Sequence, residues 1–298
     1  MDYGRLVTRS FEIAWKYKSL WIFGLFAGGG WSNLNFDIPT RKSYSFDTPG
    51  LENILDISPE KIVMFAIAVV TVIVVMILLS FISEAALIDS VNRIDRGGRY
   101  RFMDAFSTGI DFFLRFLGVF LLGVFTGIVF TAILALAAVI FFKIHTAMGI
   151  LSLLAIIPLF LLGSFAIFSL IVLTQRVMVV RNVSIGDALE EAYLLFRRNL
   201  SKTAIVFLIY IGLAILLGIA AVIIWAIFSI PIAALGLAAH MEPISAFFAA
   251  LIVGLPVSLV LGGFLGVFFS SLYTLFYFQL VEPKGVAAPQ TPPASATV

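Results

Sequence analysis

The sequence predicts an all-α integral membrane protein with six transmembrane helices in three hairpin repeats, each preceded by a cytoplasmic amphipathic interfacial helix. Hydrophobic residues fill 61% of the 298 positions and charged residues only 12%, so polar groups cannot cover the apolar surface in water. Several uncharged runs exceed the roughly 20 residues that a helix needs to cross a bilayer. Three amphipathic segments, each followed by such a run, complete the pattern.

The composition also excludes several other classes of protein. The apolar runs are continuous rather than alternating, which disfavours a β-barrel. The net charge of +2 is too small to indicate a nucleic-acid partner, and the absence of cysteine excludes disulfides and cysteine-ligated zinc. Residues 2–18 are amphipathic and no small-residue cleavage site follows an apolar core, so we expect no cleavable signal peptide.

The first repeat unit covers about residues 1–98. Its interfacial helix, 2–18, is followed by an apolar run that meets three consecutive glycines after only about ten residues. That run crosses the bilayer only if the helix extends over 20–36 or takes its first turns from the interfacial helix. A polar outer loop follows at 32–60, and the uncharged residues 63–82 form the second span.

The second repeat unit, about 99–182, has the same order of elements. Its interfacial helix covers 102–115, with phenylalanines on one face and Asp, Ser and Thr on the other. The two spans that follow, 116–142 and 148–173, are joined by a tight turn.

The third repeat unit, about 183–282, contains the clearest amphipathic helix, 184–202. Ser184 followed by Asp187 predicts a capping-box-like start, because the serine hydroxyl can meet free backbone amides at the helix start. Residues 204–239 and 244–281 are assigned to the two spans of this unit. Residues 283–298 are rich in Pro and Ala and are expected to form a disordered tail. Residues 1–282 thus form a single helical membrane domain.

The basic residues predict the orientation. Fifteen of the 19 Lys and Arg fall on one side if both termini and the loops between repeat units share that side. The protein is therefore expected in the inner membrane of a prokaryotic cell, with both termini in the cytoplasm. Four basic residues remain on the outer side, namely Arg41, Lys42, Lys61 and Lys143.

The three amphipathic segments align without gaps over five positions: Phe11 to Trp15, Phe106 to Ile110 and Leu189 to Tyr193. Because each unit starts in the cytoplasm, the repeats would be parallel, around a pseudo-threefold axis along the membrane normal. The alternative is that any amphipathic helix before a span aligns this well over five degenerate positions.

Three stretches carry a resemblance to a known family: WKYKSLWIFGLFAGGG, ALIDSVNRIDRGGRYRFMDAFSTGIDFFLRFLG and VRNVSIGDALEEAYLLFRRN. They resemble an uncharacterised group of prokaryotic polytopic membrane proteins that includes the membrane domain attached to some glycerophosphoryl diester phosphodiesterases. The catalytic barrel of those enzymes is a separate domain with acidic and histidine metal ligands, which nothing here encodes. The resemblance therefore implies a fold and a compartment, and no catalytic residue is carried over.

Ionisable residues are missing from the central parts of all six runs, which weighs against ion-coupled transport and intramembrane hydrolysis. Polar side chains within the runs are expected to bond to their own helix backbone or to a neighbour. These residues are Thr71, Thr126, Thr131, Ser164, Tyr210, Ser229 and Ser258. Glycines at a spacing of four, Gly123 with Gly127 and Gly262 with Gly266, predict close helix packing.

Two groups of charged residues have alternative interpretations. Glu84, Asp89 and Arg93, with Arg176 and Arg181, form either a gate or binding ring, or solvated helix ends that anchor the chain; we favour solvated ends. A second group, on the outer side, is either a metal site or a set of solvated turn residues, and we favour the latter: His145, His240 and Glu242.

The sequence predicts neither a catalytic residue nor a cofactor, so we expect a non-enzymatic, lipid-associated scaffold or accessory protein. Its partners would be the bilayer, anionic lipid head groups and a protein on the cytoplasmic face. The residues expected at that interface are Trp15, Arg115, Tyr193, Arg197 and Arg198. The alternative is a permease without ion coupling for a small apolar or amphipathic solute, such as a lipid. That function requires a cavity lined by residues such as Thr126, Ser164 or Tyr210.

Overall fold

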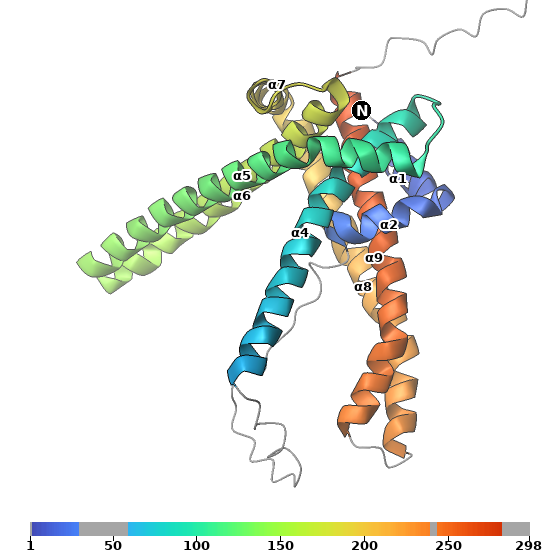
Figure 1. The fold of residues 1–298 in the computed structure, drawn as a ribbon. Helices are drawn as coiled ribbons and strands as arrows, with labels where there is room; N and C mark the ends of the chain where they lie inside the picture. The colour runs from blue at the N-terminus through green and yellow to red at the C-terminus, as the bar shows by residue number, and fades with distance from the viewer. Residues whose placement is uncertain (1, 30–58, 239–242, 282–298) are drawn as a thin grey trace, which may run out of the picture.

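The computed structural model describes residues 2–29, 59–238 and 243–281, and its regular structure over these ranges is helical (Figure 1). Five helices are long and apolar enough to cross a membrane: α4, α5, α6, α8 and α9. The elements are α1 (Tyr3–Lys16), the 3-10 turn η1 (Lys18–Leu20), α2 (Trp21–Gly24), the π-helical η2 (Leu25–Gly29), α4 (Pro59–Asp95), α5 (Phe102–Ile144), α6 (Thr146–Arg181), α7 (Ile185–Arg198), α8 (Leu200–Ala238) and α9 (Pro243–Val281).

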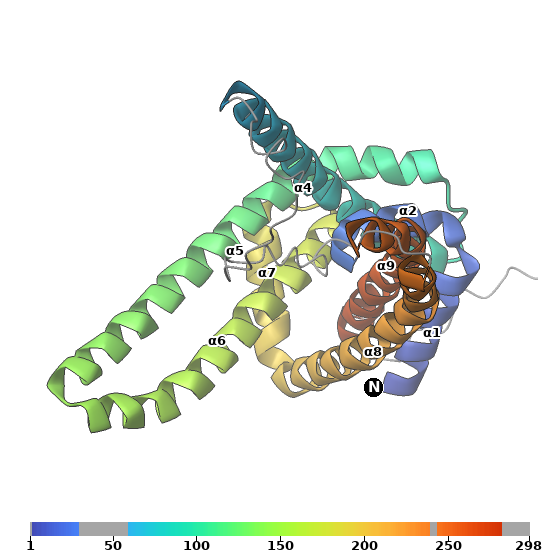
Figure 2. The same ribbon diagram turned by 90° about the horizontal axis from the view of Figure 1, so that it is seen from below.

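The long helices meet at one end and diverge from it (Figures 1 and 2). α5 pairs with α6 and α8 pairs with α9, while α4 packs on α5 and α9. The side chains that are less than 2% exposed concentrate where the helices meet, and Ile88, Phe116, Met178 and Phe276 are among them. We call this region the packed end; it comprises α1, α7 and residues 81–95, 102–119, 172–181 and 267–281.

The two short helices of the packed end begin with the predicted kind of cap. The side chain of Asp2 accepts a hydrogen bond from Arg5 N at 3.0 Å and starts α1. Ser184 Oγ accepts from Asp187 N at 3.3 Å and starts α7, which confirms the predicted cap. Asn182, with a φ of 51°, ends α6 in the left-handed conformation just before this cap.

The segment predicted as an interfacial helix, 102–115, is helical but is not a separate element. α5 is a single helix of 43 residues that contains both this segment and the following span. No proline or capping residue lies between Arg115 and Leu117, so the helix continues through this point. Phe116 is fully buried there. Figures 1 and 2 show that α5 instead changes direction along its length, so its first turns lie across the packed end.

The predicted first span, 20–36, is described only as far as Gly29. There it forms a short, broken apolar segment, Lys18–Ala27, of about 15 Å at 1.5 Å per residue, which is half of a bilayer core. The Trp21 indole donates to the Ala14 carbonyl at 2.7 Å and folds the segment back against α1. The sixth span and the threefold repeat therefore stay predictions. The outer loop before residue 59 and the tail 283–298 lie outside the described residues.

Glycines allow this short segment to dock on α9. A Cβ at Gly24 would overlap the Gly263 carbonyl and lie 2.8 Å from Val267 N. A Cβ at Gly266 would lie 2.6 Å from the Gly24 carbonyl carbon. The packing predicted from glycine spacing thus holds for Gly266. It also holds for Gly123, which packs on Ile171, whereas no described atom lies within 4 Å of a Cβ at Gly127.

We predict that Gly266→Ala lowers the free energy of unfolding in mixed micelles by about 1–3 kcal/mol, because the new methyl group meets backbone that cannot move aside. Gly127→Ala is the matched control and should leave stability unchanged or raise it by about 1 kcal/mol, because its methyl group enters open space. Equal effects of the two substitutions would contradict this packing of α2 on α9.

Candidate ligand-binding cavity

Polar side chains from three helices meet where α4, α6 and α9 come together at the packed end. Arg176 Nη2 of α6 donates to Glu84 Oε1 of α4 at 2.7 Å, and Ser270 Oγ of α9 donates to the same oxygen at 3.1 Å. The Arg176 side chain is 4% exposed and that of Glu84 is 16% exposed. A charged pair is therefore buried between helices that are otherwise apolar.

Arg176 is held on several sides. Its Nη1 donates to Gln175 Oε1 at 2.9 Å and lies 3.3 Å from the Val172 carbonyl oxygen. Its guanidinium group lies over the ring of Tyr273, 5.7 Å from the centroid, in cation–π geometry. The Nε atom is buried and has no hydrogen-bond partner among the described residues. The arginine thus has a fixed position with one donor unused.

A half-open cavity of about 1190 Å³ lies beside this pair. It exceeds the range of about 300–1,000 Å³ that is usual for small-molecule sites. Residues from α4, α5, α6, α8, α9 and η2 line it, and Tyr210 and Trp225 of α8 mark a length of about 22 Å along that helix at 1.5 Å per residue. The cavity therefore extends over a large part of a bilayer core of about 30 Å.

The cavity is polar at one end and apolar along the rest of its length. Glu84, Gln175 and Arg176 lie at the packed end, together with Ser270 and the two tyrosines Tyr210 and Tyr273. Away from them the lining is mainly aliphatic and aromatic, and includes Met76, Ala214, Gly218, Ala221, Val222, Leu255, Leu259 and Leu261. This distribution matches a molecule with a small polar head and a long apolar tail.

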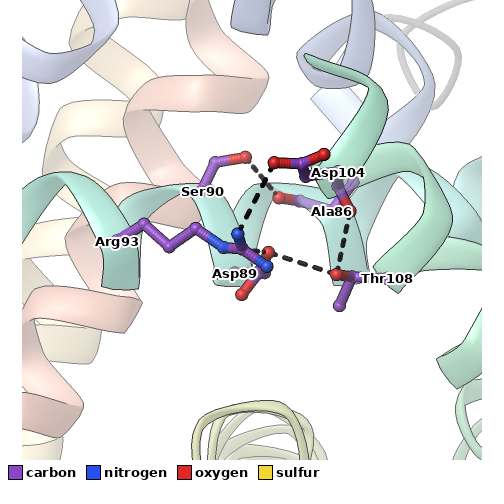
Figure 3. A network of polar contacts seen from close by, with 6 residues as sticks. All are labelled: Ala86, Asp89, Ser90, Arg93, Asp104 and Thr108. Carbon is purple, nitrogen blue, oxygen red and sulfur yellow. Dashed lines mark hydrogen bonds and ion pairs between the residues drawn. The ribbon is translucent and has the colours of Figure 1, made fainter. Parts of the chain in front are cut away.

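A second polar network joins α4 to α5 and does not line the cavity (Figure 3). Asp89 Oδ2 accepts from Arg93 Nε at 2.8 Å and lies 3.3 Å from Thr108 Oγ1, while Arg93 Nη1 is 4.0 Å from Asp104 Oδ2. Arg93 and Asp104 are 39% and 48% exposed, so this network is partly open to solvent. We assign it the structural role of fixing the start of α5 against α4.

The structure corrects the interpretation of the charged helix ends. The favoured prediction, solvated residues that anchor the helices, is wrong for Arg176, which is buried, and for Glu84, which is only 16% exposed; the two are paired across 92 positions of sequence. It is also wrong for Asp89, which is 8% exposed. Arg93 and Arg181 are more open, and Arg181 pairs with Glu191 of α7 at 3.0 Å.

The residues predicted at the lipid interface lie apart from the cavity. Trp15 of α1 is 61% exposed and packs beside Phe11, and Tyr193 of α7 is 49% exposed. The neighbouring Arg197 and Arg198 are also exposed. Arg115 of α5 is half-buried, donates to Asn182 Oδ1 at 2.9 Å and lies over the Phe112 ring. Contact of these five residues with lipid stays a prediction.

The other polar residues within the predicted spans differ in whether the structure agrees with the prediction made for them. Thr71 and Ser258 donate to the carbonyls of Ile67 and Gly254, as predicted for hydroxyls within spans. Ser229 Oγ is buried without a partner among the described residues, which differs from that prediction. Of the residues required for a permease, Tyr210 lines the cavity and Thr126 and Ser164 do not.

The proposed outer metal site is not assembled by the described residues. His145 caps α6, its Nδ1 accepting from Ala147 N at 3.1 Å, and no metal-ligand cluster occurs in the described parts of the chain. His240 and Glu242 lie outside those parts.

Sequence reasoning missed Gln175, Ser270 and Tyr273 as residues of the site. The sequence does contain one indication that Arg176 is buried. Arg176 stands in the apolar run IVLTQRVMVV, and apolar residues continue on both sides of it. A solvated helix end would not continue as an apolar stretch after the arginine. Its partner could not be identified, because Glu84 lies on a different helix 92 positions earlier.

Taken together, the described residues form a helical protein with five membrane-length apolar helices and a cavity that is polar at one end and apolar along the rest. The chain belongs to a family of unknown function, DUF7544, which matches residues 7–284. No curated protein and no solved structure matches it.

We predict that Arg176→Met lowers the free energy of unfolding by about 3–5 kcal/mol, because it leaves Glu84 as an unpaired buried charge. The double variant Glu84→Gln/Arg176→Met should recover most of that loss. Arg181→Met is the control and should cost no more than about 1 kcal/mol, since its ion pair is largely exposed. A double variant as unstable as Arg176→Met would show that the charge pairing does not stabilise the packed end.

Proposed function

We propose that this protein is a non-enzymatic membrane protein that binds an amphipathic, lipid-like solute between its helices and carries it without ion coupling. Of the two functions expected from the sequence, the permease for a small apolar or amphipathic solute is the one that the cavity favours. The observation that carries the proposal is the long apolar cavity with Glu84 and Arg176 at one end.

The shape and chemistry of the cavity support a lipid-like solute. Aliphatic and aromatic walls favour an apolar chain, because its transfer from water or from a polar interface gains about 25 cal/mol per Å² of buried area. The head of the solute would lie at the packed end beside the ion pair. A small polar metabolite would leave most of the apolar wall unmatched.

The same residues argue against coupling to an ion gradient. Glu84 and Arg176 are the acidic and basic side chains among the described residues that line the cavity, and they neutralise each other. An ion-coupled carrier needs a carboxylate or other ligand that is free to bind and release a cation. Among the described residues of the lining, the one carboxylate is that of Glu84, which is paired with Arg176, so movement down a concentration gradient is the simpler mechanism.

We place the protein in the inner membrane of a prokaryotic cell, with both termini in the cytoplasm, on the excess of basic residues on one side. In this orientation the packed end lies at the cytoplasmic interface, and the head of the solute lies at the level of the cytoplasmic leaflet. The predicted first span, 20–36, lies outside the described residues beyond Gly29 and stays a prediction.

We predict that Gly218→Phe reduces the lipid that copurifies with the protein, because the ring fills part of the cavity. Gly212→Phe is a matched control on the same helix: a side chain at either position enters space without a described atom within 4 Å, but Gly212 does not line the cavity. Bound lipid per protein, measured by native mass spectrometry, should fall about tenfold only in Gly218→Phe. Equal lipid in both variants would contradict binding in the cavity.

The second candidate function is the lipid-associated scaffold, and the exposed basic side chains of α7 favour it. Arg197 and Arg198 are exposed next to the exposed ring of Tyr193, on a short helix at the packed end. Such a surface can attract anionic head groups of a membrane or an acidic partner protein. This function does not require the cavity, so a separate experiment tests it.

We predict that Arg197→Glu/Arg198→Glu weakens binding of the nanodisc-reconstituted protein to vesicles that contain anionic lipid by at least about tenfold, at about 1 kcal/mol per basic residue. Arg99→Glu/Arg101→Glu changes the net charge equally at exposed positions outside α7 and serves as the control. Unchanged binding by the α7 variant, or the same loss in both variants, would count against a specific role for α7.

A further inference from the structure

The charges that line the cavity sum to zero. Glu84 contributes one negative and Arg176 one positive charge, and the two are in contact at 2.7 Å. An anionic head group would either add a net negative charge to a buried region or displace Glu84 from its partner. Both cost free energy, because a buried charge without compensation is strongly unfavourable. The pair therefore selects against a solute that carries a net charge.

The pair also has one unused acceptor that a ligand can reach. Glu84 Oε1 already accepts from Arg176 and Ser270, while Oε2 makes no hydrogen bond with any described residue. Arg176 Nε has no partner either, but it is enclosed by protein atoms and the whole residue is only 3% exposed, so a ligand does not reach it. A matching head group would contain a hydrogen-bond donor for Glu84 Oε2.

Three aromatic rings line the cavity together with Glu84. Tyr210 and Tyr273 are in contact, with centroids 5.2 Å apart, and Phe168 lies within 6.1 Å of both. The faces of such rings attract ammonium groups, and Tyr273 already does so for the guanidinium of Arg176.

We propose that the solute is a zwitterionic phospholipid with a primary ammonium group, as in a phosphoethanolamine head. This inference rests on the proposed function and specifies the ligand of the same cavity. The ammonium group donates to Glu84 Oε2, the phosphate is attracted by the positive charge of the Arg176 guanidinium, and the acyl chains lie along α8 and α9. The total charge of the site stays zero when the lipid is bound.

The test is a titration of the delipidated full-length protein in detergent, followed by native mass spectrometry. Four lipids with identical acyl chains are compared. Three are phospholipids with ethanolamine, choline or glycerol in the head, and the fourth is diacylglycerol, which has no phosphate. We expect the ethanolamine lipid to bind about tenfold more tightly than the anionic glycerol lipid and the diacylglycerol. The choline lipid should be intermediate, because it keeps both charges but has no N–H donor.

Variants identify the residues that carry this preference. Glu84→Gln/Arg176→Gln keeps the site neutral and should bind all four lipids with similar affinity. Arg181→Gln/Glu191→Gln removes an ion pair outside the cavity and should keep the preference of the wild type. If the double variant at the cavity does not fold, the order of the four lipids in the wild type decides the question.

The possible results separate this inference from the proposed function. Equal binding of all four lipids by the wild type, or tighter binding of the glycerol lipid, would overturn the zwitterionic preference while the cavity remains a lipid site. If Gly218→Phe leaves the binding of all four lipids unchanged, both proposals are overturned, because the lipids would then lie elsewhere on the protein.

Discussion

An arginine between apolar helices must find its counter-charge within the protein, because an unpaired charge there costs several kcal/mol. Arg176 meets this requirement by reaching from α6 to Glu84 on α4, and Ser270 brings α9 to the same carboxylate oxygen. Three helices are thereby fixed against one another at the packed end. Because the cavity lies directly beside the pair, the interaction that holds the helices together also supplies the polar wall of the site.

Small residues allow the N-terminal segment to pack against α9, whereas the ion pair fixes the long helices against one another. Close contact between Gly24 and Gly266 lets α2 and η2 lie on α9, and η2 then adds Leu25, Phe26 and Ala27 to the cavity lining. A π-helical turn in this position is consistent with the frequent occurrence of such turns at functional sites. Beyond the packed end the helices diverge and expose aliphatic side chains, as expected for surfaces that contact lipid tails (Figure 2).

Local chemistry made the helices and their caps predictable, whereas contacts distant in sequence were not. The apolar runs and the Ser184 cap depend on neighbouring residues, so all five long helices and α7 could be predicted. The continuity of α5 was missed, because an amphipathic face followed by an apolar run does not show whether the helix stops between them. Glu84 and Arg176 were interpreted as solvated ends, because they lie on different helices 92 positions apart and only the tertiary structure brings them together. The lining residues Gln175, Ser270 and Tyr273 come from different turns of two helices and form no sequence motif.

The central claim is that a lipid occupies the cavity with its head at the ion pair. A structure of the protein in nanodiscs of native membrane lipid, at a resolution that shows acyl chains, tests it most directly. We expect elongated density along α8 and α9 that ends in a compact head beside Glu84 and Arg176. A packed end in which side chains fill the cavity, or a cavity without density for a chain, would contradict the claim.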